Sequence, residues 1–345
     1  MNRRSIPLIL VAAVLGVGCV SHQMYREDSI EEEEAYTLAF IEFDDRGEIW
    51  SPSQVYRLQD LILSANRHEE GAVVIVLAHG WNNDASPKNE KNGTLAGFKS
   101  TLETLAQGVR AESPDRPVVG IYLGWRGKSM VSPFTYLSCS SRQRAAARVA
   151  GPQGMAVLSR VILDVKTNPE SSLILIGHSF GGQIIERIVQ QGVAAGVAEI
   201  QEGPAGSAPD LTVLLNPASP ATNAKQVIDL LRWGRIELLR TTADGRQFNV
   251  PLMVSLTSAN DKATRVAYRV GSLVGLATSK FRTYGPEFCS PVISQRSLYA
   301  RTAGHMPELH SHEVRVRSAS ERPSSATSSD HGFVIAGDGV DIEVE

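Results

Sequence analysis

The sequence has no excess of basic side chains. Its 34 lysines and arginines face 37 aspartates and glutamates, which gives a net charge of −3. Proteins that bind nucleic acids carry a basic surface that neutralises phosphates, so the composition gives no indication of such a partner. The sequence also lacks internal repeats of about 20 to 50 residues, which argues against solenoid and propeller architectures.

The N-terminal apolar run is too short to span a membrane. It covers Ile6 to Val17 and follows Arg3 and Arg4, whereas a transmembrane helix needs about 20 apolar residues. A basic start followed by a short apolar run is typical of a signal peptide. We therefore expect residues 1–18 to direct export and to be removed. The mature chain would keep 32 basic and 37 acidic side chains, a net charge of −5.

The residues up to Cys19 resemble a bacterial lipobox, in which the cysteine is lipidated and becomes the new N-terminus. Gly16 stands three residues before Cys19, where the lipobox has leucine. The resemblance implies a lipid anchor at Cys19, while simple cleavage and an uncleaved anchor stay open. We expect an exported protein of the cell envelope, either bound to the membrane through this anchor or periplasmic.

Cysteine is scarce in the rest of the chain. With Cys19 lipidated, only Cys139 and Cys289 remain. Disulfides persist in exported proteins, so we expect these two cysteines to pair.

The polar stretch 19–35 ends in four consecutive glutamates, Glu31 to Glu34. A run of like charges is usually solvated, so this stretch is predicted to be an acidic tether ahead of one domain at 36–345. The first strand of that domain runs into Asp44 and Asp45, which lack the spacing of a calcium loop. These two aspartates predict a hairpin or strand-edge turn.

From residue 36 to residue 261, apolar runs of strand length alternate with helical patterns. Strands that alternate with helices favour a mostly parallel sheet with helices on both faces. Two irregular segments, 124–141 and 262–312, interrupt the pattern and are predicted to be lid or cap segments beside a pocket. The strands are expected at 36–43, 72–77, 118–123, 173–176, 211–215 and 251–257, and the helices at 55–65, 95–109, 142–166, 183–189 and 221–239.

The stretch from Leu173 to Gly182 joins a strand pattern to a helix pattern through Gly-His-Ser-Phe-Gly at 177–181. This is a G-x-S-x-G motif. A serine on a tight strand-to-helix turn has strained backbone geometry, and the glycines on either side let other backbone come close. Such a turn presents the Ser179 hydroxyl instead of burying it, so Ser179 is predicted to be a nucleophile.

Together with this motif, the strand at 73–77 that runs into His79-Gly80-Trp81 resembles the α/β-hydrolase family. The resemblance implies an α/β-hydrolase fold, a Ser-His-Asp triad and no cofactor. It also implies that the backbone N–H groups of Trp81 and Phe180 form an oxyanion hole. His79 is interpreted as a residue that shapes this loop.

The family's chain order places the acid after a later strand and the histidine near the C-terminus. Asp261 fits the first place, with a turn aspartate as the alternative interpretation. His331 fits the second, and His310 and His312 stay open as alternatives for the base. The family commonly has a closing helix after this histidine, but residues 332–345 do not read as a helix.

Histidines also raise the possibility of a metal site. His305, Glu308, His310 and His312 are of types that hold zinc. Their spacing matches no strong zinc signature, so we predict no metal site.

These residues predict a serine hydrolase of the cell envelope that cleaves carboxylic esters of a small molecule or a lipid. A histidine must take the proton of the Ser179 hydroxyl as it attacks, because a neutral serine is a poor nucleophile. Acyl length, thioester or amide substrates and the oligomeric state stay open. The second hypothesis is a catalytically silent lipoprotein of the same fold that binds a lipid or a protein partner.

Overall fold

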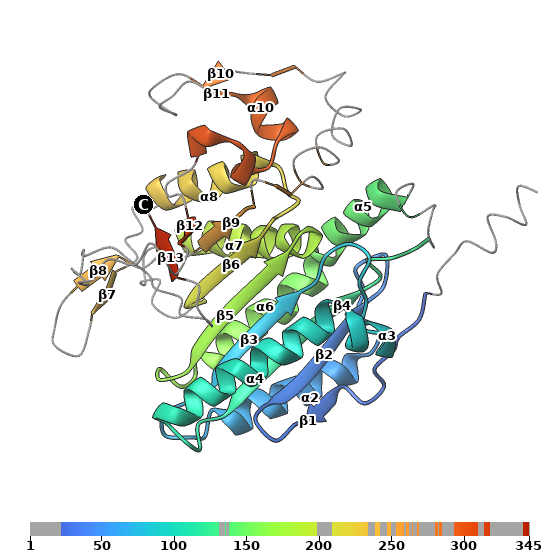
Figure 1. Ribbon diagram of the computed structural model, residues 1–345, viewed down its shortest axis with the longest axis vertical. Helices are drawn as coiled ribbons and strands as arrows, with labels where there is room; N and C mark the ends of the chain where they lie inside the picture. The colour runs from blue at the N-terminus through green and yellow to red at the C-terminus, as the bar shows by residue number, and fades with distance from the viewer. Residues whose placement is uncertain are drawn as a thin grey trace, which may run out of the picture.

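Seven strands form one sheet in the order β1-β2-β4-β3-β5-β6-β9 (Figure 1). This computed structural model describes residues 22–130, 135, 138–198, 209–233, 239–241, 247–249, 253–258, 260–261, 264, 268, 280–281, 283–284, 293–309, 314–317 and 341–344. β1 is antiparallel to β2, and all other neighbours in the sheet are parallel. The predicted mostly parallel α/β sheet is therefore confirmed.

The strands of the sheet agree with the predicted apolar runs, apart from β1. They are β1 (Ile30–Glu32), β2 (Thr37–Phe43), β3 (Val73–Ala78), β4 (Val118–Trp125), β5 (Ser172–His178), β6 (Leu211–Leu215) and β9 (Met253–Leu256). The main helices are α2 (Pro52–Ala65), α3 (Pro87–Asn92), α4 (Thr94–Glu112), α5 (Cys139–Val149), α6 (Pro152–Val165), α7 (Phe180–Ala198) and α8 (Ala221–Trp233).

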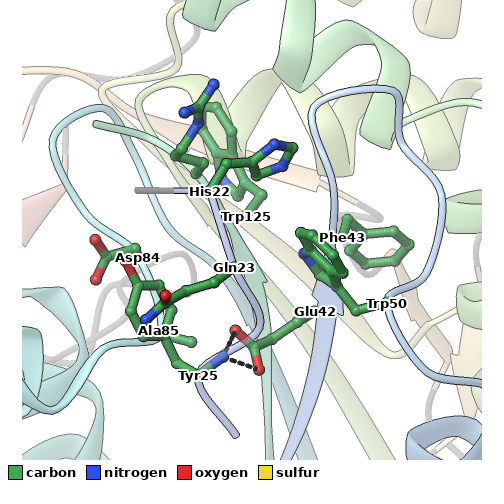
Figure 2. A pocket seen from close by; sticks show the side chains of 10 residues that line it. His22, Gln23, Tyr25, Glu42, Phe43, Trp50, Asp84, Ala85 and Trp125 are labelled. Atoms are coloured by element: carbon green, nitrogen blue, oxygen red, sulfur yellow. Dashed lines mark hydrogen bonds between the residues drawn. The ribbon is translucent and has the colours of Figure 1, made fainter. Parts of the chain in front are cut away.

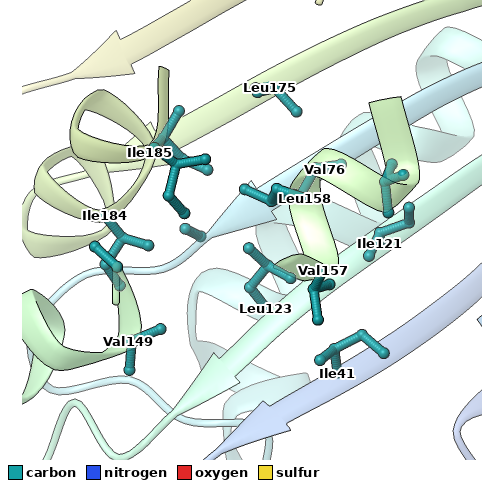
Figure 3. Packing of buried hydrophobic residues seen from close by; sticks show 14 of the residues in the cluster. Ile41, Val76, Ile121, Leu123, Val149, Val157, Leu158, Leu175, Ile184 and Ile185 are labelled. Carbon is teal, nitrogen blue, oxygen red and sulfur yellow. The ribbon is translucent and has the colours of Figure 1, made fainter. Parts of the chain in front are cut away.

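Helices cover both faces of the sheet because alternate strand residues point to opposite sides. On one face α2, α5, α6 and α7 pack against alternate apolar residues of β2, β3, β4 and β5 (Figure 3). On the other face α4 buries Leu95, Phe98 and Leu102 against β2, β3 and β4. Both apolar clusters are built from the predicted strand patterns, so the sequence periodicity accounts for the layered core.

Short elements follow β9 in the predicted cap segment 262–312. They are the antiparallel pair β10 (Thr283–Tyr284) and β11 (Ile293–Ser294), the helix α10 (Gln295–Ala300), and the 3-10 turns η3 (Ala303–His305) and η4 (Pro307–Leu309). Two further antiparallel pairs are β7 (Leu239–Thr241) with β8 (Gln247–Asn249), and β12 (Val314–Arg317) with β13 (Asp341–Val344). The turn η3 contacts both β9 and α8, so it lies at the sheet edge where β9 ends.

Part of the predicted acidic tether is a strand of the sheet. Within 19–35, residues Ile30–Glu32 form β1 and pair with β2. Lys99 of α4 lies 2.7 Å from Glu31 and 3.3 Å from Glu33, and Arg26 lies 2.5 Å from Glu31. Because Ile30–Glu32 pair with β2 and basic side chains bind Glu31 and Glu33, the prediction of a solvated tether is wrong for this part of the segment.

The turn after β2 is the one predicted from its aspartates. The backbone N–H of Asp44 donates to the Glu48 carbonyl at 2.8 Å, and Gly47 adopts a φ of 83°. Arg142 and Arg126 both bind the Asp45 carboxylate. Burial raises the pKa of Asp45, but the hydrogen bonds and charges of the two arginines outweigh burial and lower the pKa to about 2.

Asp45→Asn is expected to destabilise the fold. The folded pKa of Asp45 lies below the unfolded value, so the carboxylate stabilises the protein above about pH 4, and this contribution disappears as the pH falls towards 2. We expect Asp45→Asn to lower the free energy of unfolding at pH 7 by about 2 kcal/mol, measured by urea denaturation. The exposed Asp60 supplies the control: Asp60→Asn should change little. Equal stability of Asp45→Asn and the parent protein would contradict this account.

Candidate active site

Ser179 occupies the sharp turn between β5 and α7. Its φ is 55°, in the left-handed region that residues with a side chain rarely adopt. The Ser179 N–H donates to the Leu215 carbonyl at 3.0 Å, and the Ser179 carbonyl accepts from the Ala218 N–H at 2.9 Å. These bonds from β6 and the loop after it hold the strained turn, so the expected strand-turn-helix geometry is present at Ser179.

Two glycines allow this turn to touch the end of β3. A Cβ atom on Gly181 would lie 1.9 Å from the Ala78 carbonyl oxygen, and one on Gly80 would lie 2.8 Å from the Ser179 Cβ. No side chain fits at such distances. The loop after β3 therefore lies directly against the serine.

His79 fixes the shape of that loop. It is fully buried, and its ring stacks on Tyr122 and Trp125 with centroids 5.3 and 5.4 Å away. Its Nε2 accepts the Trp125 backbone N–H at 3.1 Å, so the proton is on Nδ1, which donates to the Gly80 carbonyl at 2.9 Å. Burial lowers the pKa of His79 to about 4. A neutral, fully bonded ring agrees with the loop-shaping role interpreted from the sequence.

A second pair of hydrogen bonds joins the same loop to the end of β4. The Asn82 N–H donates to the Gly127 carbonyl at 3.0 Å, and the Gly127 N–H donates to the Asn83 carbonyl at 2.9 Å. Trp81 lies in this clamped loop, and Phe180 is the first residue of α7, where the helix dipole favours negative charge. Their positions support the oxyanion-hole assignment, which stays a prediction.

The strand order places Ser179 where open α/β sheets commonly bind ligands. β3 and β5 are neighbours in the sheet. The connection from β3 to β4 contains α4, which covers one face of the sheet, whereas α7, which follows β5, covers the other face. The chain therefore leaves these two strands in opposite directions, and open α/β sheets commonly bind ligands at the carboxyl ends of such strands. Ser179 and Gly80 both lie there.

Asp261 follows β9, at the same edge of the sheet. Its Oδ2 accepts the Thr264 hydroxyl at 2.8 Å, and the Thr264 Oγ1 lies 2.9 Å from Nε2 of His305. A hydroxyl has one proton, so if that proton goes to the carboxylate, the His305 Nε2 must be the donor to Thr264. The structure thus links Asp261 to a histidine of η3 through a buried threonine.

Asp261 also lies within electrostatic reach of the serine turn. Burial lowers the pKa of His178, and the charge of Asp261 partly opposes this shift. A Cβ atom on Gly80 would lie 2.9 Å from the His178 Nδ1, which places the His178 ring beside the loop that abuts Ser179. The predicted nucleophile and acid are therefore brought to one region of the sheet edge.

Other predicted site residues lie outside the described part of the chain. These are Cys19, Cys289, His310, His312 and His331. Cys139 is the first residue of α5, and its pairing with Cys289 stays a prediction. Among the described residues, no group of three His, Cys, Asp or Glu side chains could hold a metal ion.

The sequence did not single out Thr264 or the partnership of His305 with it. Thr264 stands three residues after Asp261, and that spacing brings side chains together in a turn. His305 is 41 residues further along the chain. Only the folded chain brings it to Thr264.

The cavity in Figure 2 is lined by neither Ser179 nor Gly80. It lies at the ends of β2 and β4, where His22, Tyr25, Glu42, Trp50 and Trp125 are among the residues that line it. Its volume of about 10 Å³ has room for about one water molecule. It is therefore too small to receive an organic substrate.

Glu186 is a buried carboxyl group on α7, seven residues after Ser179. It is 2% exposed, and the Asn223 side-chain amide donates to its Oε2 at 3.3 Å. Burial raises the pKa of Glu186 to about 7, although hydrogen bonds from Ser219 and Asn223 oppose the shift. Glu186 thus connects the helix that starts at the serine with the beginning of α8.

Gly80→Ala is expected to distort the serine site without unfolding the chain. The new methyl group would push on the Ser179 Cβ and displace the Trp81 N–H, so reaction with a fluorophosphonate should slow by roughly 100-fold, the typical cost of one oxyanion-hole donor. Gly97→Ala is the matched control, because a Cβ there meets no atom within 4 Å and should only strengthen α4. Equal reaction rates in both variants would contradict the close approach of Gly80 to Ser179.

Glu186→Gln is expected to stabilise the protein at high pH. The folded pKa of Glu186 is raised, so its favourable contribution is present below the unfolded value and disappears as the pH rises through 7. A neutral glutamine avoids the buried charge, and we expect about 1 to 3 kcal/mol more stability than the parent at pH 8.5, with little difference at pH 5. Urea denaturation at both values measures it. If Glu186→Gln and the parent differ in stability by the same amount at pH 8.5 and at pH 5, titration of Glu186 is not the cause of the difference.

No protein-family model matches the chain, and no curated protein matches it. Among solved structures, an acetylxylan esterase determined at 0.90 Å resolution is similar, with 14% sequence identity. The match covers 55% of this chain and 83% of the esterase, with a TM-score of 0.23.

Proposed function

We propose that the protein is a serine hydrolase that cleaves ester bonds through Ser179, with the triad of an α/β-hydrolase. The observation that supports this most directly is the strained backbone of Ser179, with a φ of 55°, directly beside Gly80. A strained residue at a sheet edge indicates function when the surrounding structure holds it in place. Here β6, the loop after it and the loop after β3 all hold it.

In the proposed reaction the Ser179 Oγ attacks the ester carbonyl while a histidine takes its proton. The negative charge that develops on the carbonyl oxygen is bound by the N–H groups of Trp81 and Phe180, and one such donor is worth about 3 to 4 kcal/mol. The histidine then gives the proton to the departing alcohol, which leaves an acyl-enzyme. Water, activated by the same histidine, releases the acid and restores the serine.

We propose Asp261 as the acid that orients the histidine and His331 as the base. The Asp261 carboxylate accepts a hydrogen bond from the Thr264 hydroxyl, and the Thr264 oxygen is in turn within hydrogen-bond distance of His305. This support fixes the direction of the carboxylate, as a pre-organised catalytic group requires. His305 is therefore proposed as a positioning residue, and it is also the first competitor of His331 for the role of base.

The proposed setting is the cell envelope. Residues 1–18 would direct export, and a lipid on Cys19 would attach the mature protein to the membrane. No helix among the described residues is long and apolar enough to cross a membrane. The proposed substrate is an ester of a small molecule or a lipid, and the reaction as written uses no cofactor.

Fluorophosphonate labelling tests the nucleophile. We expect the purified protein to be labelled on Ser179 and Ser179→Ala not to be labelled. Ser100→Ala, which changes an exposed serine of α4, should label like the parent. If the parent protein does not react, or if Ser179→Ala still reacts, the catalytically silent lipoprotein becomes the better interpretation.

The same labelling, followed over time, tests the other two members of the triad. We expect His331→Ala to slow the reaction by roughly 1,000-fold or more, and Asp261→Asn to slow it by a similar factor. His305→Ala should cause a smaller loss, because it acts through Asp261. The alanine variants of His310 and His312 complete the series. If His331→Ala reacts like the parent while His305→Ala does not react, the assignment of the base is wrong.

A further inference from the structure

The described residues begin at the same edge of the sheet as Ser179. The His22 Nε2 accepts the Asp45 backbone N–H at 3.1 Å, and its ring lies 5.1 Å from Trp50. The N–H groups of Tyr25 and Arg26 donate to the buried Glu42 carboxylate at 2.7 to 3.1 Å. These contacts fasten residues 22–26 across the carboxyl end of β2, as Figure 2 shows for Tyr25 and Glu42.

A short series of contacts leads from these residues to the serine. His22 and Trp125 line the same small cavity (Figure 2). The Trp125 N–H donates to His79, and the next residue, Gly80, abuts Ser179. Because β2, β4, β3 and β5 are parallel neighbours, their carboxyl ends share one edge. His22 therefore marks the edge of the sheet that carries the serine.

The distance from this point to the proposed lipid is short. Cys19 precedes His22 by three residues, which span at most about 11 Å even when fully extended. The opposite edge of the sheet is further away by the length of a strand, about 23 Å for the seven residues of β2. A lipid on Cys19 would hold the serine edge near the bilayer surface and would leave the opposite edge away from it.

We propose that the lipid anchor turns the Ser179 edge towards the membrane, and that the substrate is an ester-bearing amphiphile at the bilayer surface. This inference rests on the proposed function and on lipidation of Cys19. Trp50 is 38% exposed at this edge, and Arg46 is exposed beside it. Tryptophan favours the membrane interface and arginine favours anionic headgroups, so both suit such an orientation.

Charge adds little to this orientation. Asp44 and Glu48 flank Arg46 in the same turn, and Asp45 is neutralised by arginines. At this turn four arginines, Arg46, Arg126, Arg142 and Arg148, face three carboxylates, Asp44, Asp45 and Glu48. An excess of one positive charge attracts anionic lipids only weakly. The orientation is accordingly expected to depend on the short anchor and to persist at high salt, where surface electrostatic attraction is screened.

The test uses the full chain, lipidated during expression in a bacterial host. The mass of the N-terminal peptide should show the lipid on Cys19. The protein is placed in vesicles of phosphatidylethanolamine and phosphatidylglycerol that carry a nitroxide headgroup quencher. A fluorophore is attached at Arg46→Cys, or at Glu69→Cys in the loop ahead of β3 at the opposite edge. Both probe variants also carry the substitutions Cys139→Ser and Cys289→Ser.

We expect the Arg46→Cys probe to lose most of its fluorescence and the Glu69→Cys probe to keep most of it, at low and at high salt. A 20-residue Gly/Ser insertion before His22, with a reach of roughly 25 Å, should make the two probes similar. Equal quenching without the insertion, or an unmodified Cys19, would overturn the proposed orientation.

Activity tests the substrate class separately. The insertion should lower the hydrolysis of an ester embedded in the vesicles and leave the hydrolysis of a soluble short-chain ester unchanged. If both rates stay the same, the amphiphile proposal fails. If the protein hydrolyses neither ester and does not react with fluorophosphonate, the proposed function fails, while the quenching comparison still decides the orientation.

Discussion

The close approach of α7 to the end of β3 is the constraint on which the site depends. At Gly181 the Ala78 backbone lies where a side chain would stand, and at Gly80 the Ser179 Cβ does. These contacts set how near the loop after β3 comes to Ser179. The apolar residues of α7, β3 and β5 that pack behind it hold the contact in place. A closely packed core changes little in shape, so Ser179 and the loop after β3 keep fixed positions relative to each other.

The strain at Ser179 is supported by neighbouring hydrogen bonds. A residue with a side chain in the left-handed region costs about 1 to 3 kcal/mol, and the bonds to Leu215 and Ala218 oppose that cost. The loop on the other side is held just as firmly, since His79 bonds to Trp125 and Gly80. Rigid support on both sides is what an oxyanion hole requires, because its donors must be in place before charge develops.

Local patterns in the sequence predict the sheet and the serine turn, because both follow from residues close together in the chain. The strand before Ser179, the start of the helix after it and the glycines around it all lie within ten residues of it. The sequence does not predict β1, because Glu31 of this strand is neutralised by Lys99, more than 60 residues away. The link from Asp261 through Thr264 to His305 is equally non-local, and no spacing rule identifies it. Distant partners of charged and polar groups are therefore what the sequence leaves undetermined.

The geometry around Asp261 bears on the role proposed for His305. A base must present a nitrogen without a proton to Ser179 while its other N–H meets the carboxylate. When the Thr264 hydroxyl donates its hydrogen bond to Asp261, the His305 Nε2 must carry a proton, and its N–H donates to the Thr264 oxygen. A positive charge on His305 would then meet Asp261 across a hydroxyl group, where the stabilisation is weaker than in direct contact. The base proposed here, His331, would contact Asp261 directly, and His305 keeps its proposed role of holding the carboxylate in place through Thr264.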